Sequence, residues 1–102
     1  MTCHRKYVFD FQAADVGHDQ VQYLLDQAAE DHWWYSLPDV TGQDEGHMLV
    51  TFQVVGRDQW WAHRRAMDLI TTVVWEYGYD IPVPTWETLP PHTNRGYSRV
   101  RK

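Results

Sequence analysis

The residues of this chain best suited to catalysis or metal binding are six histidines and one cysteine. The histidines are His4, His18, His32, His47, His63 and His92. No two of them are spaced as HxH, HxxxH or HExxH, the patterns that bring two imidazoles to one metal ion. The sequence also contains no GxxxxGK[ST], GxSxG or CxxC motif, so phosphate-loop, serine-hydrolase and redox-dithiol chemistry have no support. We therefore predict no catalytic residue, no cofactor and no metal site.

A second group of residues is suited to binding. Between Asp58 and Tyr77, tryptophan, arginine and aspartate recur at steps of three and four, which places them along one face of a helix. Tryptophan and arginine anchor protein interfaces because they offer a large contact area and planar hydrogen bonding. We predict that this face binds a partner through Trp61, Arg64, Arg65, Asp68 and Trp75.

Three occupants of this face remain open: another protein, a second copy of the chain, or the chain's own C-terminal segment through Trp86 and Tyr97. Arg64 and Asp68 can also simply form an ion pair at i,i+4. The chain is short and acidic, and arginine and valine far exceed lysine and isoleucine, a bias common in GC-rich genomes. These features suit a phage or mobile-element factor that acts on a host protein.

A different class of function is small-molecule binding or cofactor-free enzyme activity in a dimer. His32, Trp34, Tyr35 and His63 could line a hydrophobic pocket in which the imidazole and phenol groups serve as polar handles. An aromatic segment of this kind packs in a core more often than it performs chemistry. We therefore rank this alternative below partner binding.

The net charge of −5 is unevenly distributed. The first 94 residues hold five Lys or Arg against fourteen Asp or Glu, and the remaining basic residues are Arg95, Arg99, Arg101 and Lys102. An acidic body repels nucleic acid, so a role as a nucleic-acid accessory protein would depend on this basic tail. We predict one domain over residues 1–90 and a basic C-terminal tail over residues 91–102.

The compartment is expected to be cytoplasmic. No run approaches the roughly 18 apolar residues that span a bilayer, and the N-terminal residues do not have the pattern of a signal peptide. Cys3 is the only cysteine, so it cannot form a disulfide within the chain.

The elements that must position these residues follow from periodicity and turn chemistry. Alternation of aromatic and polar residues predicts strands, a spacing of three and four predicts helices, and Pro or Gly marks the ends. The predicted strands are 5–12, 32–37 and 47–55, with a short or irregular edge segment in 79–89. The predicted helices end near Glu30 and Tyr77, the first capped by Asp15 or Asp19, the second by Asp58 and Gly78. Pro38 is expected to end the second strand, leaving residues 39–46 as a hairpin connection.

This order of elements resembles the ferredoxin-like βαββαβ arrangement, an α+β fold in which a four-stranded antiparallel sheet carries both helices on one face. The other face is then open, and RNA-recognition modules of the same topology stack bases there. If Phe9 and Phe52 face the core, the open face presents Val8, Asp10, Leu49, Thr51 and Gln53. That set stacks bases poorly, so we do not expect nucleic acid to be the partner of the sheet.

Overall fold

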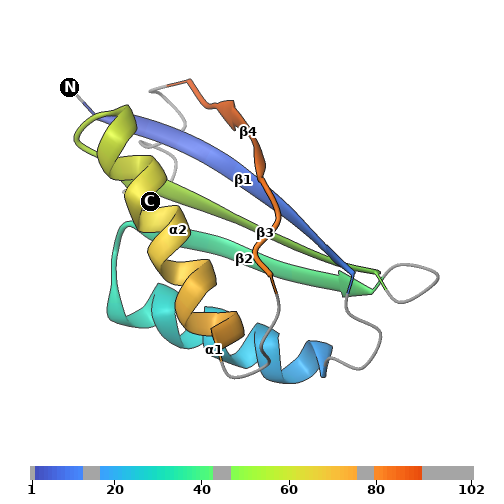
Figure 1. The fold of residues 1–102 in the computed structure, drawn as a ribbon. Coiled ribbons are helices and arrows are strands. Elements are labelled where there is room, and N and C mark those ends of the chain that lie inside the picture. Colours follow the sequence, from blue (N-terminus) through green and yellow to red (C-terminus); the bar gives the residue numbers. More distant parts are fainter. Residues whose placement is uncertain (1, 13–16, 43–46, 76–79, 91–102) are drawn as a thin grey trace.

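The computed structural model of the chain describes residues 2–12, 17–42, 47–75 and 80–90. Its elements are β1 (Cys3–Gln12), α1 (His18–Asp31), β2 (Tyr35–Gly42), β3 (His47–Gly56), α2 (Gln59–Val74) and β4 (Thr85–Thr88). Both helices lie on one side of the sheet (Figure 1). The predicted βαββαβ α+β fold is therefore confirmed, whereas the predicted tail, residues 91–102, lies outside the described residues.

The sheet is antiparallel, with strand order β2-β3-β1-β4. The central strands β1 and β3 pair along their whole length, from Cys3 opposite Gly56 to Gln12 opposite His47. Residues that alternate along these strands point toward the helices and are buried, as their periodicity predicted. These inward residues are Tyr7, Phe9, Phe11, Met48, Val50, Phe52 and Val54.

The helices close the core over this aromatic sheet face. α1 contributes Val21 and Leu25, and α2 contributes small and branched residues that recur at steps of three and four along one side of the helix. The buried residues of α2 are Ala62, Ala66, Leu69, Ile70, Val73 and Val74. The backbones of β3 and α2 approach closely at Gly56, where a Cβ atom would lie 2.4 Å from the backbone nitrogen of Ala62.

The helix ends agree in part with the prediction. Asp58 is the N-cap of α2, and its side chain accepts a hydrogen bond of 2.9 Å from the backbone N–H of Trp61. The N-cap of α1 is Gly17, while Asp19 lies in the first turn, where its charge complements the helix dipole. The other predicted caps, Asp15 and Gly78, and the predicted helix end at Tyr77 lie outside the described residues.

The predicted position of the second strand was wrong. β2 does not span residues 32–37 and does not stop at Pro38, because it begins at Tyr35 and continues through the proline to Gly42. Its pairing with β3 shifts between Ser36 and Asp39, and Leu37 there has a φ of 50°. An edge strand with such an irregularity tolerates the missing proline N–H. The chain before β2 is therefore a helix cap and turn, which holds Trp33 and Trp34 outside the sheet.

The fourth strand is short and lies at the edge of the sheet, as predicted for residues 79–89, where Pro82 and Pro84 remove two backbone donors. β4 pairs with β1, where Thr88 lies opposite Arg5 and Trp86 lies opposite Tyr7. The backbone N–H of Leu89 also donates to the carbonyl oxygen of His4. No helix in the described part of the chain is long and apolar enough to cross a membrane.

Candidate partner-binding surface

Four tryptophans gather at the end of the molecule where α1 leads to β2 and β3 leads to α2. We call Trp33, Trp34, Trp60 and Trp61 the tryptophan cluster. Each consecutive pair meets edge to face, with ring centroids 5.9 Å apart for Trp33 and Trp34 and 4.9 Å apart for Trp60 and Trp61. Trp33 is 74% exposed and Trp60 is 59% exposed, an unusual degree of exposure for such large apolar side chains.

Arginine side chains hold this cluster together. The guanidinium of Arg65 lies 4.2 Å from the ring centroid of Trp34 and 5.9 Å from that of Trp61. One of its N–H groups donates to the carbonyl oxygen of Val55 at 2.7 Å. The guanidinium of Arg57 lies 4.8 Å from the Trp61 ring. The cation–π contacts of Arg65 with Trp34 and Trp61 therefore join the two tryptophan pairs.

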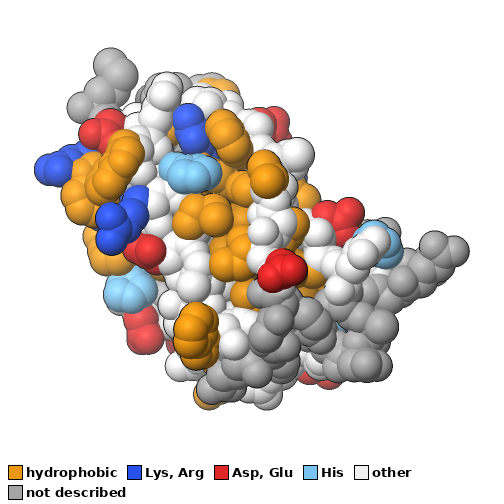
Figure 2. Space-filling model, in the orientation of Figure 1, with side chains coloured by type: hydrophobic (Ala, Val, Ile, Leu, Met, Phe, Trp, Pro, Cys, Tyr) orange, Lys and Arg blue, Asp and Glu red, His pale blue; other side chains and the backbone are white. Residues whose placement is uncertain are grey.

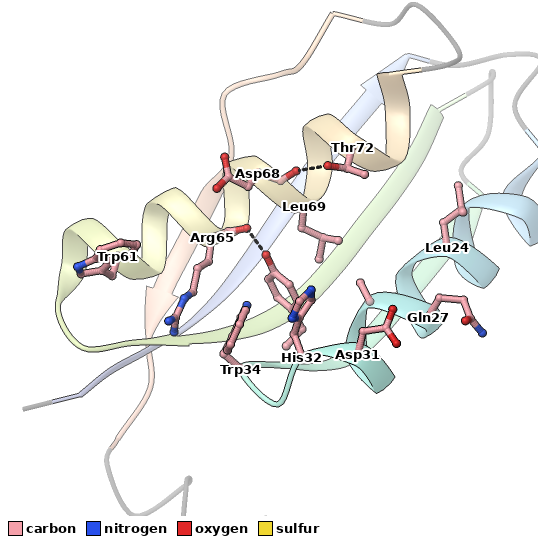
Figure 3. A pocket seen from close by; sticks show the side chains of 12 residues that line it. Leu24, Gln27, Asp31, His32, Trp34, Trp61, Arg65, Asp68, Leu69 and Thr72 are labelled. Atoms are coloured by element: carbon pink, nitrogen blue, oxygen red, sulfur yellow. Dashed lines mark hydrogen bonds between the residues drawn. The ribbon is translucent and has the colours of Figure 1, made fainter.

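Two hollows flank the cluster. The larger, here called the helix groove, has a volume of about 580 Å³ and runs between α1 and α2 (Figure 3). Its lining includes aliphatic residues (Leu24, Ala28, Leu69), aromatic residues (Trp34, Tyr35, Trp61) and two carboxylates (Asp31, Asp68). The smaller, here called the end cleft, has a volume of about 230 Å³ and is lined by Thr2, Trp33, Val55, Gly56, Arg57, Trp61 and Arg65. Trp61 and Arg65 line both hollows, so they form the wall between them.

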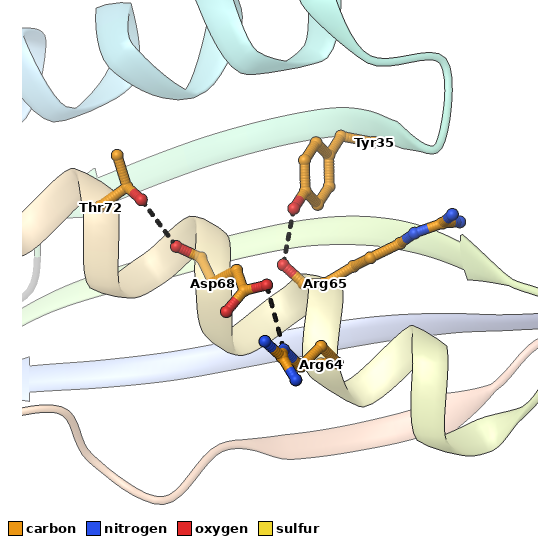
Figure 4. A network of polar contacts seen from close by, with 5 residues as sticks. All are labelled: Tyr35, Arg64, Arg65, Asp68 and Thr72. Carbon is orange, nitrogen blue, oxygen red and sulfur yellow. Dashed lines mark hydrogen bonds and ion pairs between the residues drawn. The ribbon is translucent and has the colours of Figure 1, made fainter.

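Hydrogen bonds brace the wall of the helix groove (Figure 4). The hydroxyl of Tyr35 donates to the backbone carbonyl of Arg65 at 2.6 Å, which ties β2 to α2. Burial raises the pKa of the Tyr35 phenol, so the hydroxyl keeps its proton and remains a donor. Arg64 and Asp68 form an exposed ion pair of 3.4 Å, and Thr72 donates to the carbonyl oxygen of Asp68.

The structure brings most of the predicted partner-binding face together but leaves Trp75 apart. Trp61, Arg65 and Asp68 line the helix groove. Arg64 forms an ion pair with Asp68, and its guanidinium lies over the ring of Trp60. Trp75 is 78% exposed but lies beyond the last turn of α2. With a rise of 1.5 Å per residue, it is about 21 Å along the helix axis from Trp61.

The C-terminal segment does not cover this face through Trp86. That ring packs on the other flank of α2, with its centroid 5.7 Å from the rings of both Tyr7 and His63. Arg5 also places its guanidinium 4.9 Å from the Trp86 ring. Tyr97, the other residue proposed to cover the face, lies outside the described residues.

The predicted pocket residues divide between the two flanks of α2. His32, Trp34 and Tyr35 line the helix groove, where the His32 ring stacks on Trp34 at a centroid distance of 4.6 Å. His63 does not join them, because its Nδ1 lies 3.3 Å from the hydroxyl of Tyr7 on the opposite flank. The physical reason is helical geometry, since residues 61 and 63 project about 200° apart around the axis.

In the tryptophan cluster and the arginines that contact it, the residues not predicted were Trp33, Trp60 and Arg57. The signal available was the repeated Trp-Trp dipeptide at 33–34 and 60–61, but nothing local shows that the two dipeptides meet.

In the described part of the chain, no group of three or more His, Cys, Asp or Glu side chains is arranged to hold a metal ion. The predicted nucleic-acid tail residues, Arg95, Arg99, Arg101 and Lys102, lie outside the described residues.

Comparison with known proteins adds information on the fold alone. No protein-family model matches the sequence, and no curated protein is significantly similar to it. A de novo designed protein, Foldit4, is similar in structure with a TM-score of 0.51 and 8% sequence identity, over 88% of this chain and 98% of the design. The C-terminal domain LarC2 of a cyclometallase involved in the synthesis of the NPN cofactor of lactate racemase, in its apo form, has a TM-score of 0.45 and 11% identity, over 87% of this chain and 56% of that one.

Proposed function

We propose that this chain is a non-catalytic binding module that docks another protein on the tryptophan cluster. The observation that carries the proposal is the exposure of Trp33 and Trp60, 74% and 59%, near Arg65, which a hydrogen bond to Val55 already holds in place. A partner that covered both rings would remove roughly 100 to 150 Å² of each from water. This corresponds to about 3 kcal/mol of transfer free energy for each ring, before the costs of association.

The composition of the surface supports a protein partner. Tryptophan and arginine are enriched in the energetically dominant centres of protein interfaces. Arg65 loses little further freedom on binding, because it already stacks on Trp34 and donates to Val55. Such preorganisation lowers the entropic cost of binding.

The test compares alanine variants of Trp33 and Trp60 with a matched control on the same molecule. Trp75→Ala removes an equally exposed tryptophan about 21 Å from the cluster, measured along the helix. Proteins captured from a lysate of the source organism should be retained by Trp75→Ala and lost by the double variant Trp33→Ala and Trp60→Ala. Circular dichroism must show that both variants remain folded. A partner that the double variant retains at full affinity would refute the proposal.

The same variants distinguish a foreign partner from a second copy of the chain. Sedimentation velocity measures self-association directly, without any other protein present. If the wild-type chain dimerises and the cluster double variant is monomeric, the partner is another copy of this chain.

A second candidate function is small-molecule binding in the helix groove. Its volume of about 580 Å³ lies within the range of ordinary ligand pockets, and His32 and Tyr35 supply polar groups at its edge. Melting temperatures measured with flavin, haem and quinone ligands test this candidate. A ligand-dependent increase that disappears when Leu69 in the groove is replaced by Gln would favour it, and no shift with any of them would count against it.

A further inference from the structure

The positive charges of the described chain lie toward one end of the molecule. Arg5 and Lys6 lie near the start of β1, Arg57 lies between β3 and α2, and Arg64 and Arg65 lie in the first half of α2. The β1–β3 register places the first residues of β1 beside the end of β3, so these segments share an end. On the face drawn in Figure 2, the Lys and Arg side chains gather over this end. Asp58 and Asp68 lie on the same segments, so an anionic group of a partner is expected at the arginines that no carboxylate neutralises.

The arginines around the tryptophan cluster differ in whether their charge is already neutralised. Arg64 is paired with Asp68 at 3.4 Å. Arg57 and Arg65 form no ion pair with any carboxylate among the described residues. Both line the end cleft, together with Trp33 and Trp61. A guanidinium has five donors, and Arg65 directs one N–H group to Val55, so both arginines retain donors for an anion.

The helix groove on the other side of the Trp61 and Arg65 wall has the opposite character. Its aliphatic residues, Leu24, Ala28 and Leu69, suit an apolar side chain. Asp31 also lines it, forms no ion pair among the described residues, and would repel a second anion. Adjacent positions of one ligand would therefore meet a cationic cleft and an apolar groove.

We propose that the partner presents a peptide segment in which an Asp or Glu carboxylate enters the end cleft and a neighbouring bulky apolar side chain enters the helix groove. This inference rests on the proposed function, because it names the chemistry of the segment that the tryptophan cluster binds. A nucleic-acid strand fits less well, since its regularly spaced phosphates would continue past the arginines toward the carboxylates of Asp31 and Asp58. The chain's net charge of −5 also disfavours a nucleic-acid strand, which carries a negative charge at every phosphate, more than a peptide with a single carboxylate.

The test is a selection of random 12-residue peptides displayed on phage against the immobilised full chain. Selected sequences should carry Asp or Glu next to Phe, Leu, Trp or Met. A fluorescein-labelled copy of the most enriched peptide should lose about 10-fold in affinity by anisotropy when its acidic residue becomes Asn or Gln. Its affinity should also fall as NaCl rises from 50 to 300 mM.

Two variants locate the carboxylate. Arg57→Gln should weaken the labelled peptide about 10-fold, because it removes an unneutralised charge from the end cleft. Lys6→Gln is the matched control, because it removes one positive charge from the same end of the molecule but lines neither hollow. It should change the affinity less than about 2-fold. Neither side chain is buried, so both variants should fold, which circular dichroism checks.

The outcomes separate this inference from the proposed function. Peptides that require Trp33 and Trp60 but contain no acidic residue and are unaffected by Arg57→Gln would overturn the inference and leave the proposed function standing. Acidic peptides bound equally well by the tryptophan double variant would refute docking on the cluster. A labelled 12-nucleotide oligo-dT that binds more tightly than every selected peptide, and depends on Arg57, would replace the peptide with a nucleic acid. Failure to enrich any peptide would also overturn the inference.

Discussion

Replacing Gly56 by alanine should strongly destabilise the protein. Gly56 is the buried last residue of β3, and it lies against the first turns of α2. A Cβ atom at this position would be 2.4 Å from the backbone nitrogen of Ala62 and 2.9 Å from both the Ala62 Cα and the Trp61 carbonyl carbon. These are backbone atoms, so no change of side-chain rotamer can relieve the overlap.

The magnitude follows from what must move. The added methyl group forces the start of α2 away from β3 and disturbs the packing of Ala62 and Ala66, both fully buried. Overpacking typically costs about 1 to 3 kcal/mol, and a backbone overlap belongs at the upper end of that range. For a domain of this size, about 3 kcal/mol lowers the melting temperature by roughly 15 °C.

Thermal and urea denaturation followed by circular dichroism measure this effect, with Gly42→Ala as the control. A Cβ at Gly42 would also make a close contact, 2.7 Å, but with the imidazole of His18, which can rotate away. We expect the control to lose less than about 1 kcal/mol. If Gly56→Ala and Gly42→Ala melt within about 3 °C of each other, the backbones of β3 and α2 do not approach as closely at Gly56 as described.

Two further predictions concern buried polar groups. Tyr35→Phe removes the 2.6 Å hydrogen bond to the Arg65 carbonyl and should lower the free energy of unfolding by about 1 kcal/mol in urea titrations; an unchanged midpoint would show that the bond does not stabilise the fold. Burial lowers the pKa of His4, against a smaller opposing effect from Gln53, so the unfolded chain binds more protons below about pH 6.5. The free energy of unfolding should therefore fall as the pH is lowered from 7 to 5, and it should fall less steeply in His4→Gln than in the wild-type chain. Equal slopes for the two proteins would contradict this.

Much of the fold could be predicted from the sequence because its determinants are local. The alternation of Tyr7, Phe9 and Phe11 predicted which face of β1 is buried, and the spacing of apolar residues did the same for α2. The N-cap at Asp58 was also predictable, since a capping side chain reaches only to the next turn. Each of these features depends on residues within a few positions of one another.

The position of β2 could not be predicted locally. Proline usually ends a strand, yet here an irregularity at Leu37 lets the edge strand continue through Pro38 to Gly42. That result depends on the pairing partner β3, which places Tyr35 opposite Val54. As a consequence, Trp33 and Trp34 belong to a turn at the end of the molecule.

The candidate surface shows the same division between local and tertiary information. The sequence established that Trp61, Arg64, Arg65 and Asp68 share a helix face, because helical spacing is a local property. The tertiary structure brought Trp33 and Trp34 to that face and placed His63 on the opposite flank. It also left the charges of Arg57 and Arg65 without a carboxylate partner among the described residues. Residues 34 and 61 are 27 positions apart, and they approach because β2 pairs with β3 and α2 packs on the same sheet.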